Sequence, residues 1–113
     1  MERPVLVIGA GQAGLAAGYH LKNARVPFVI VDGHRRVGDS WRERYDSLSL
    51  FTSRQFSALP GLDLAGNREL YASRDEFADY LEAYGTRFRL PIRLGRRLIR
   101  LSKAGDDGFE AAL

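Results

Sequence analysis

The chain has 113 residues, of which 45% are hydrophobic, enough for the core of one small domain or of part of a larger one. Its 17 basic and 14 acidic residues give a net charge of +3, and the lack of cysteine excludes disulfides, iron–sulfur clusters and redox-active thiols from this chain. The basic residues are interleaved with acids, so we expect no nucleic-acid partner. Two isolated histidines predict no metal site. No run of about 18 apolar residues exists, and a strand begins almost at once, so we expect no membrane contact, no signal peptide and a cytoplasmic location.

An apolar strand at the start of the chain leads directly into a glycine-rich turn. The strand is predicted over residues 4–8, and Gly9, Gly11 and Gly14 follow with the spacing Gly-x-Gly-x-x-Gly. A helix is predicted over about residues 12–24. This order of strand, glycines and helix is the beginning of a dinucleotide-binding fingerprint.

Each glycine in this turn has a separate physical task. Gly9 permits the tight turn, Gly11 lets the backbone approach a pyrophosphate, and Gly14 lets the helix pack closely on the sheet. Gln12 and Ala13 open the helix, whose free N–H groups and partial positive charge favour phosphate. The turn and the first helical residues are therefore candidate cofactor-binding residues.

A second predicted strand, residues 27–32, ends in Asp32. This acid lies 18 residues after Gly14, close to the spacing of about 20 expected for a carboxylate that binds ribose hydroxyls. A carboxylate at this position repels a 2′-phosphate. We therefore expect the adenosine half of FAD or NAD here, with Arg35 and Arg36 as neighbours that could instead favour NADP.

Residues 33–70 show no sustained periodicity and are predicted to form a long, mostly irregular excursion. A helix then begins with the capping-box pair Ser73 and Glu76 and is expected to end near Phe88. It carries one apolar stripe that we assign to the core, made of Phe77, Tyr80, Leu81, Tyr84 and Phe88.

The last part of the chain predicts short strands. Residues 91–101 form one or two strands around Gly95, and a further strand begins at Phe109 after a turn cluster. The fold class that follows is α/β: a Rossmann-like parallel sheet with an irregular insertion and the start of an antiparallel β-meander.

Three stretches carry a resemblance to a known family. The segment from Arg36 to Thr52 resembles the one that follows the second strand in flavin-containing monooxygenases, and residues 56–61 and 73–84 match as well. The similarity is greatest to bacterial flavoproteins described as NAD(P)-binding monooxygenase-like proteins, and it covers essentially the whole chain. It implies FAD as the cofactor, with NADPH as the co-substrate of a full-length relative.

The resemblance also implies which residues bind FAD. The glycine turn would line the pyrophosphate, Asp32 would bind the ribose, a Gly-x-x-Trp-Arg element would pack along the cofactor, and one residue would lie towards the flavin. The Gly-x-x-Trp-Arg element contains Gly38, Ser40, Trp41 and Arg42, and the residue towards the flavin is Thr52. No catalytic residue can be named from the chain.

Residues 1–113 are thus expected to form a single, partial FAD-binding domain of a longer flavoprotein. The second glycine fingerprint, for NADPH, is not within these residues, so the chain alone is expected to lack monooxygenase activity. Strand 5–8 would lose a neighbour and expose an apolar edge, and the strand that begins at Phe109 offers another open edge. A homodimer through either edge is therefore expected. Two alternatives remain: a non-enzymatic module for FAD, NAD or ADP, and a relic with an empty site.

Overall fold

The computed structural model describes residues 4–43, 49–53, 57–64, 66, 71–103 and 109–112. Its centre is a parallel sheet of three strands in the order β1-β2-β5. These strands are β1 (Val5–Ile8), β2 (Phe28–Val31) and β5 (Ile92–Arg93). The register pairs Val5 with Phe28 and Ile30 with Ile92. Parallel neighbours joined by helical crossovers confirm the predicted Rossmann-like sheet.

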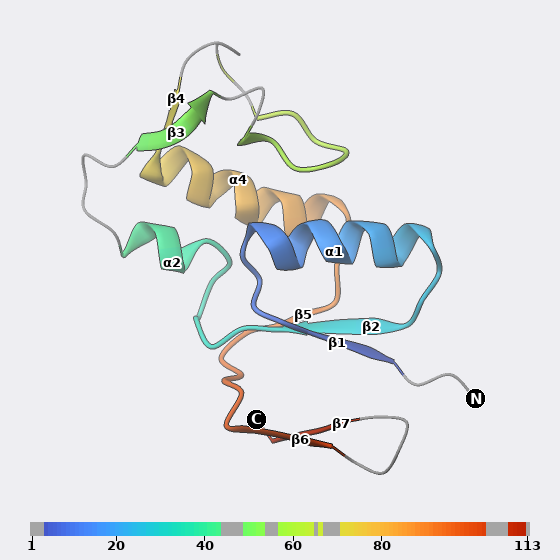
Figure 1. Cartoon of the computed structure of the whole chain (residues 1–113). Helices are drawn as coiled ribbons and strands as arrows, with labels where there is room; N and C mark the ends of the chain where they lie inside the picture. The colour runs from blue at the N-terminus through green and yellow to red at the C-terminus, as the bar shows by residue number, and fades with distance from the viewer. Residues whose placement is uncertain are drawn as a thin grey trace.

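Two long helices lie on the same side of this sheet (Figure 1). They are α1 (Gln12–Asn23) and α4 (Arg74–Arg87). Both approach the strands closely at a glycine. A Cβ on Gly18 of α1 would lie 2.9 Å from Ile30 Cδ1, and one on Gly85 of α4 would lie 2.9 Å from Ile92 Cδ1. Small residues at these positions therefore set the distance between each helix and the sheet.

The core lies between the helices and the sheet. Its largest fully buried side chains include Leu15 of α1, Ile30 of β2, and Phe77 and Tyr84 of α4. The apolar stripe of α4 is part of this core, as predicted. Burial of each such side chain stabilises the fold by roughly 1.5–3 kcal/mol.

The excursion after β2 is more regular than the sequence predicts. It contains a four-residue helix, α2 (Asp39–Arg42), and a strand, β3 (Ser49–Ser53), which pairs antiparallel with β4 (Tyr71–Ser73). Most described residues of the segment are irregular, as predicted, but the sequence did not predict α2 or β3. Such pairing between distant segments leaves no local periodicity to detect, because tertiary contacts decide it.

The chain beyond β5 forms the expected antiparallel pair. Strands β6 (Arg100–Lys103) and β7 (Phe109–Ala112) pair over four positions, from Arg100 with Ala112 to Lys103 with Phe109. They lie on the side of the parallel sheet opposite to α1 and α4 (Figure 1). Among the described residues, no helix combines the length and apolar character needed to cross a membrane.

Candidate functional site

The glycine turn between β1 and α1 has the geometry that its residue types predict. Gly9 has φ +99°, a left-handed conformation that disfavours other residues, and its amide donates to Val31 O at 2.7 Å. A Cβ on Gly14 would lie 1.9 Å from Gly9 O, so α1 and the turn are in direct contact there. A Cβ on Gly11 would meet nothing within 4 Å. There is therefore no room for a side chain at Gly14, whereas the space in front of Gly11 is open.

The N-terminus of α1 has no side-chain cap among the described residues. Gly11 is the N-cap and has no side chain to cap the helix, and the first turn contains no acidic residue. Gln12 and Ala13 are both exposed. The first-turn N–H groups of a helix have no partner within the helix. These groups, beside the open face of Gly11, form a polar, partly positive surface suited to an anion.

Asp32 connects the end of β2 to the glycine turn. Its Oδ2 accepts the Ala10 amide at 2.7 Å, while its Oδ1 accepts the His34 amide at 2.8 Å and lies 2.7 Å from His34 Nδ1. Partial burial raises the pKa of Asp32, but these hydrogen bonds outweigh it and the pKa lies below its ordinary value. Asp32 is therefore an ionised carboxylate whose side chain is only 15% exposed.

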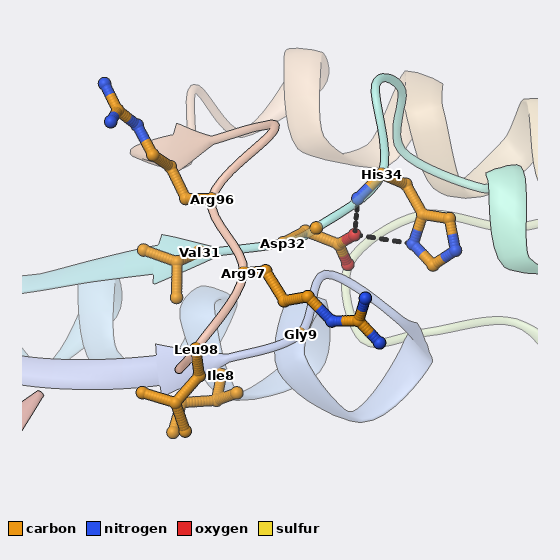
Figure 2. A pocket seen from close by; sticks show the side chains of 9 residues that line it. Ile8, Gly9, Val31, Asp32, His34, Arg96, Arg97 and Leu98 are labelled. Carbon is orange, nitrogen blue, oxygen red and sulfur yellow. Dashed lines mark hydrogen bonds and ion pairs between the residues drawn. The ribbon is translucent and has the colours of Figure 1, made fainter. Parts of the chain in front are cut away.

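A cleft of about 550 Å³ opens beside Asp32, at the carboxyl ends of β1 and β2. Its lining residues are Ile8, Gly9, Val31, Asp32, Gly33, His34, Arg96, Arg97 and Leu98. Figure 2 shows the Arg97 side chain extending past Asp32 toward the glycine turn, whereas that of Arg96 points away. The cleft thus joins a carboxylate, an arginine and apolar side chains around one space.

The sequence did not predict that residues 96–98 line the cleft. Backbone hydrogen bonds place this segment beside the end of β2: Arg96 N donates to Asp32 O at 2.8 Å, and Gly95 N donates to His34 O at 2.9 Å. A signal was available, because a short strand after the second helix of such a unit pairs with β2. The residues following β5 must then lie beside those following β2.

The Gly-x-x-Trp-Arg element lies apart from this cleft, where α2 packs on α4. Gly38 has φ +92°, and a Cβ there would be 2.5 Å from Ala78 O. The Trp41 ring meets Phe77 edge-on, with centroids 5.0 Å apart. Ser40 is exposed. None of these residues lines the cleft beside Asp32, and their cofactor contacts stay a prediction.

Arg42 joins α2 to α4. Its guanidinium donates to Val37 O and Asp39 Oδ1, and across to Asp79 Oδ1 at 2.9 Å and Glu82 Oε1 at 3.1 Å. Burial lowers the pKa of Arg42, but these hydrogen bonds outweigh it and raise the pKa. The predicted contact of Arg42 with the cofactor would have to compete with carboxylates already bound to this group.

Thr52 lies in β3, and its side chain is outside the described residues. Its predicted position near a flavin therefore stays a prediction. The structure brings together the glycine turn, the start of α1 and Asp32. It places the Trp41–Arg42 element elsewhere on the same scaffold.

A parallel sheet with a glycine turn before its first helix and an acid after its second strand defines the Rossmann class of α/β proteins. Within that class, the chain belongs to the pyridine nucleotide-disulphide oxidoreductase family, whose profile matches residues 6–112. The membership covers almost the entire chain and includes the turn, Asp32 and the cleft.

Similar proteins agree with the resemblance found in the sequence. An uncharacterized CzcO-like oxidoreductase of Geobacillus kaustophilus is 57% identical over 99 residues, which are 88% of this chain and 28% of that protein. A flavin-containing monooxygenase from Stenotrophomonas maltophilia has a TM-score of 0.84 at 35% identity, over 90% of this chain and 31% of its own. The chain thus spans less than a third of these relatives. The similarity to flavin monooxygenases is confirmed.

A more distant structure shares the fold alone. The crystal structure of OTEMO in complex with FAD and NADP has a TM-score of 0.79 at 20% identity, over 96% of this chain and 22% of its own.

Proposed function

We propose that the chain binds the adenine-dinucleotide half of FAD and forms the FAD-binding part of a flavin-dependent, NADPH-using monooxygenase-like oxidoreductase. One observation carries the proposal: Gly9 of the glycine turn and the ionised Asp32 line one cleft, and Asp32 accepts the Ala10 amide directly before the open Gly11 and the start of α1. Family membership and the similarity to flavin monooxygenases support FAD over other dinucleotides.

The pyrophosphate would lie against Gly11 and the first turn of α1. The space in front of Gly11 is open, so phosphate oxygens can approach the backbone. The amides of Gln12 and Ala13 belong to the uncapped first turn and can donate to those oxygens. No acidic residue in that turn opposes the charge.

The adenosine would occupy the cleft beside Asp32. A carboxylate has about four acceptor positions, and the protein donors at Ala10 and His34 fill three of them. The remaining position on Oδ2 can accept one ribose hydroxyl. Leu98 offers apolar surface to the adenine ring, and the Arg97 guanidinium can stack on it.

The cofactor would supply the redox chemistry, and the residues of this chain would bind and orient its adenosine and phosphate end. The oxygenated substrate and the NADPH contacts belong to the whole protein. We expect the 113 residues by themselves to bind FAD without NADPH-dependent oxygen consumption above that of free flavin.

Calorimetric titration of the chain with FAD, ADP and NAD tests the proposal. Gly11→Val fills the open space before the turn and is expected to abolish binding of all three. Ala24→Val, which adds the same side chain at the other end of α1, is the matched control and should bind normally. If the folded wild-type chain binds none of the three ligands at millimolar concentration, the proposal is wrong.

The visible spectrum separates the leading proposal from its alternative. Flavin absorption in the purified chain supports the proposal that it binds FAD. A colourless chain that NAD or ADP stabilises against heat supports a non-enzymatic dinucleotide module. A chain that takes up no nucleotide would be the structural relic.

We also propose that the chain forms a homodimer through β1. This strand pairs with β2 alone among the described residues, and Val5 and Ile8 are exposed. A second copy of β1 would satisfy the N–H and C=O groups along this edge. Light scattering across a dilution series should show a dimer, and a strict monomer at high concentration would contradict it.

A further inference from the structure

We propose that His34 is a positioning residue of the nucleotide site: its imidazole fixes the Asp32 carboxylate so that the carboxylate holds the Ala10 amide and sets the shape of the glycine turn. The part of this proposal that concerns ligand affinity rests on the proposed function. The part that concerns the turn does not.

The first step is the bridge that Asp32 makes. Its Oδ2 lies 2.7 Å from the Ala10 amide, two residues before the helix begins. Ala10 is buried, so a lost partner at this amide would leave an unsatisfied donor. The conformation of the turn therefore depends on where the Asp32 carboxylate points.

The second step is that His34 controls this orientation. Both its amide and its Nδ1 contact the same oxygen, Asp32 Oδ1, at 2.8 and 2.7 Å (Figure 2). With one oxygen held by two groups, the other oxygen is directed to Ala10. The ring nitrogen must carry a proton to donate this bond, in either the neutral or the charged imidazole.

The third step is that His34 is itself held in place. Its carbonyl accepts the Gly95 amide at 2.9 Å, which ties it to the segment after β5. Its Nε2 lies 3.7 Å from Glu43 Oε2, at the end of α2. The ring thus lies between two carboxylates, which keeps Nδ1 directed at Asp32.

The charged neighbours of His34 decide how this contact responds to pH. The hydrogen bond with Asp32 raises the pKa of His34 against the opposing effect of partial burial, and the charges of Asp32, Glu43 and Asp39 raise it further. Arg96 and Arg97 line the same cleft and are positive groups on that side. The charged imidazole contributes to the free energy of folding because its pKa is raised in the folded chain. This contribution is complete below the ordinary pKa of 6.5 and is lost as pH rises through the folded pKa.

Two variants separate hydrogen bonding from charge. His34→Asn keeps an N–H donor near the Nδ1 position but cannot become charged, whereas His34→Ala removes the donor. We expect His34→Ala to weaken FAD and ADP binding by about fivefold, the effect of one hydrogen bond. We expect His34→Asn to bind within about twofold of wild type, with an affinity that no longer changes between pH 6 and 8.

A measurement without ligand tests the turn directly. In ¹⁵N-resolved NMR spectra, the Ala10 amide should shift as His34 titrates in the wild type. It should not follow this titration in His34→Asn, and it should move to a new position in His34→Ala. If His34 acted only on its immediate surroundings, the chemical shift of the Ala10 amide would stay the same in all three proteins.

The outcomes distinguish this proposal from the proposed function. If the wild type binds no nucleotide but Ala10 follows His34, dinucleotide binding is wrong and the positioning role stands. The positioning role is overturned if Ala10 ignores His34, if His34→Ala binds as tightly as wild type, or if His34→Asn is as weak as His34→Ala. The last result would show that His34 acts by its charge on the ligand.

Discussion

The two long helices of this chain begin in opposite ways. In α4, Ser73 Oγ accepts the Glu76 amide at 3.2 Å, Glu76 Oε1 accepts the Ser73 amide at 3.4 Å, and Asp75 adds a negative charge to the first turn. In α1, Gly11 provides no side-chain cap and the first turn has no acid. Among the described residues, side chains cap the N-terminus of α4 and none caps that of α1, which is where the proposed function puts the pyrophosphate.

The same contrast holds for the regions around these helices. On the α4 side, Tyr80 OH accepts the Leu59 amide and donates to Leu62 O, and Tyr84 OH donates to Pro60 O at 2.6 Å. Burial, with smaller effects of nearby tyrosines, raises the pKa of Tyr84 to about 12, so it remains a donor. On the α4 side, the hydroxyl groups of Tyr80 and Tyr84 are hydrogen-bonded to the protein's own backbone. Near α1, the Asp32 carboxylate lines a cleft.

The largest expected effect concerns the contact between α1 and its turn. Gly14→Ala should destabilise the fold by at least about 3 kcal/mol, because the new methyl group would lie 1.9 Å from Gly9 O. The intrinsic preference of a helix for alanine, about 1 kcal/mol, is too small to offset this clash.

Gly11→Ala is the matched control for Gly14→Ala. Its methyl group meets nothing within 4 Å, so stability should change by less than about 1 kcal/mol while dinucleotide affinity falls. Urea denaturation and calorimetry measure the two effects. Equal losses of stability in both variants would contradict the distinction between a closed and an open glycine.

A smaller effect is expected from the clamp between α2 and α4. Arg42→Gln removes contacts to Asp79 and Glu82 from a guanidinium that is only 14% exposed, and should cost about 1–2 kcal/mol in urea denaturation. Arg36→Gln removes one exposed contact to Asp39 and should cost under about 0.5 kcal/mol. If Arg42→Gln instead spares stability and weakens FAD binding, Arg42 contacts the cofactor as the resemblance implies.

These comparisons also show how much of the fold the sequence can predict. β1, α1, β2 and α4 were predicted within about two residues, because each has its own periodicity or capping residues. The β3–β4 pair was not, because neither strand alternates clearly and their pairing depends on distant contacts. Local patterns predict elements that local chemistry determines.

The candidate site divides in the same way. Gly9, Gly14 and Asp32 were assigned to the turn and its acid from spacing alone, and the structure brings them together. Arg97 was not singled out, because one arginine among many has no distinguishing neighbour in the sequence. Its place beside Asp32 follows only from the pairing of β5 with β2.

A third prediction tests the capped helix. Ser73→Ala removes the acceptor of the Glu76 amide and should lower the free energy of unfolding by about 1 kcal/mol. Nucleotide affinity should not change, because α4 begins away from the cleft. Ser40→Ala, at an exposed serine within α2, is the control for stability and should change the free energy of unfolding little. A loss of affinity in Ser73→Ala would mean that the scaffold and the site are coupled.

The smallest effect gives the sharpest test of the uncapped helix. Gln12→Glu changes charge and almost no volume at an exposed position in the first turn of α1. The added carboxylate should stabilise the free chain by about 0.5 kcal/mol through the helix dipole. The same carboxylate should weaken FAD and ADP binding by about threefold, because it repels the pyrophosphate.

Asn23→Asp places an identical charge at the last residue of α1, where it should destabilise the helix slightly and leave affinity unchanged. Opposite signs for stability and affinity in Gln12→Glu would show that the free N–H groups serve an anion. If Gln12→Glu binds both nucleotides as tightly as wild type, the first turn of α1 does not face the phosphates.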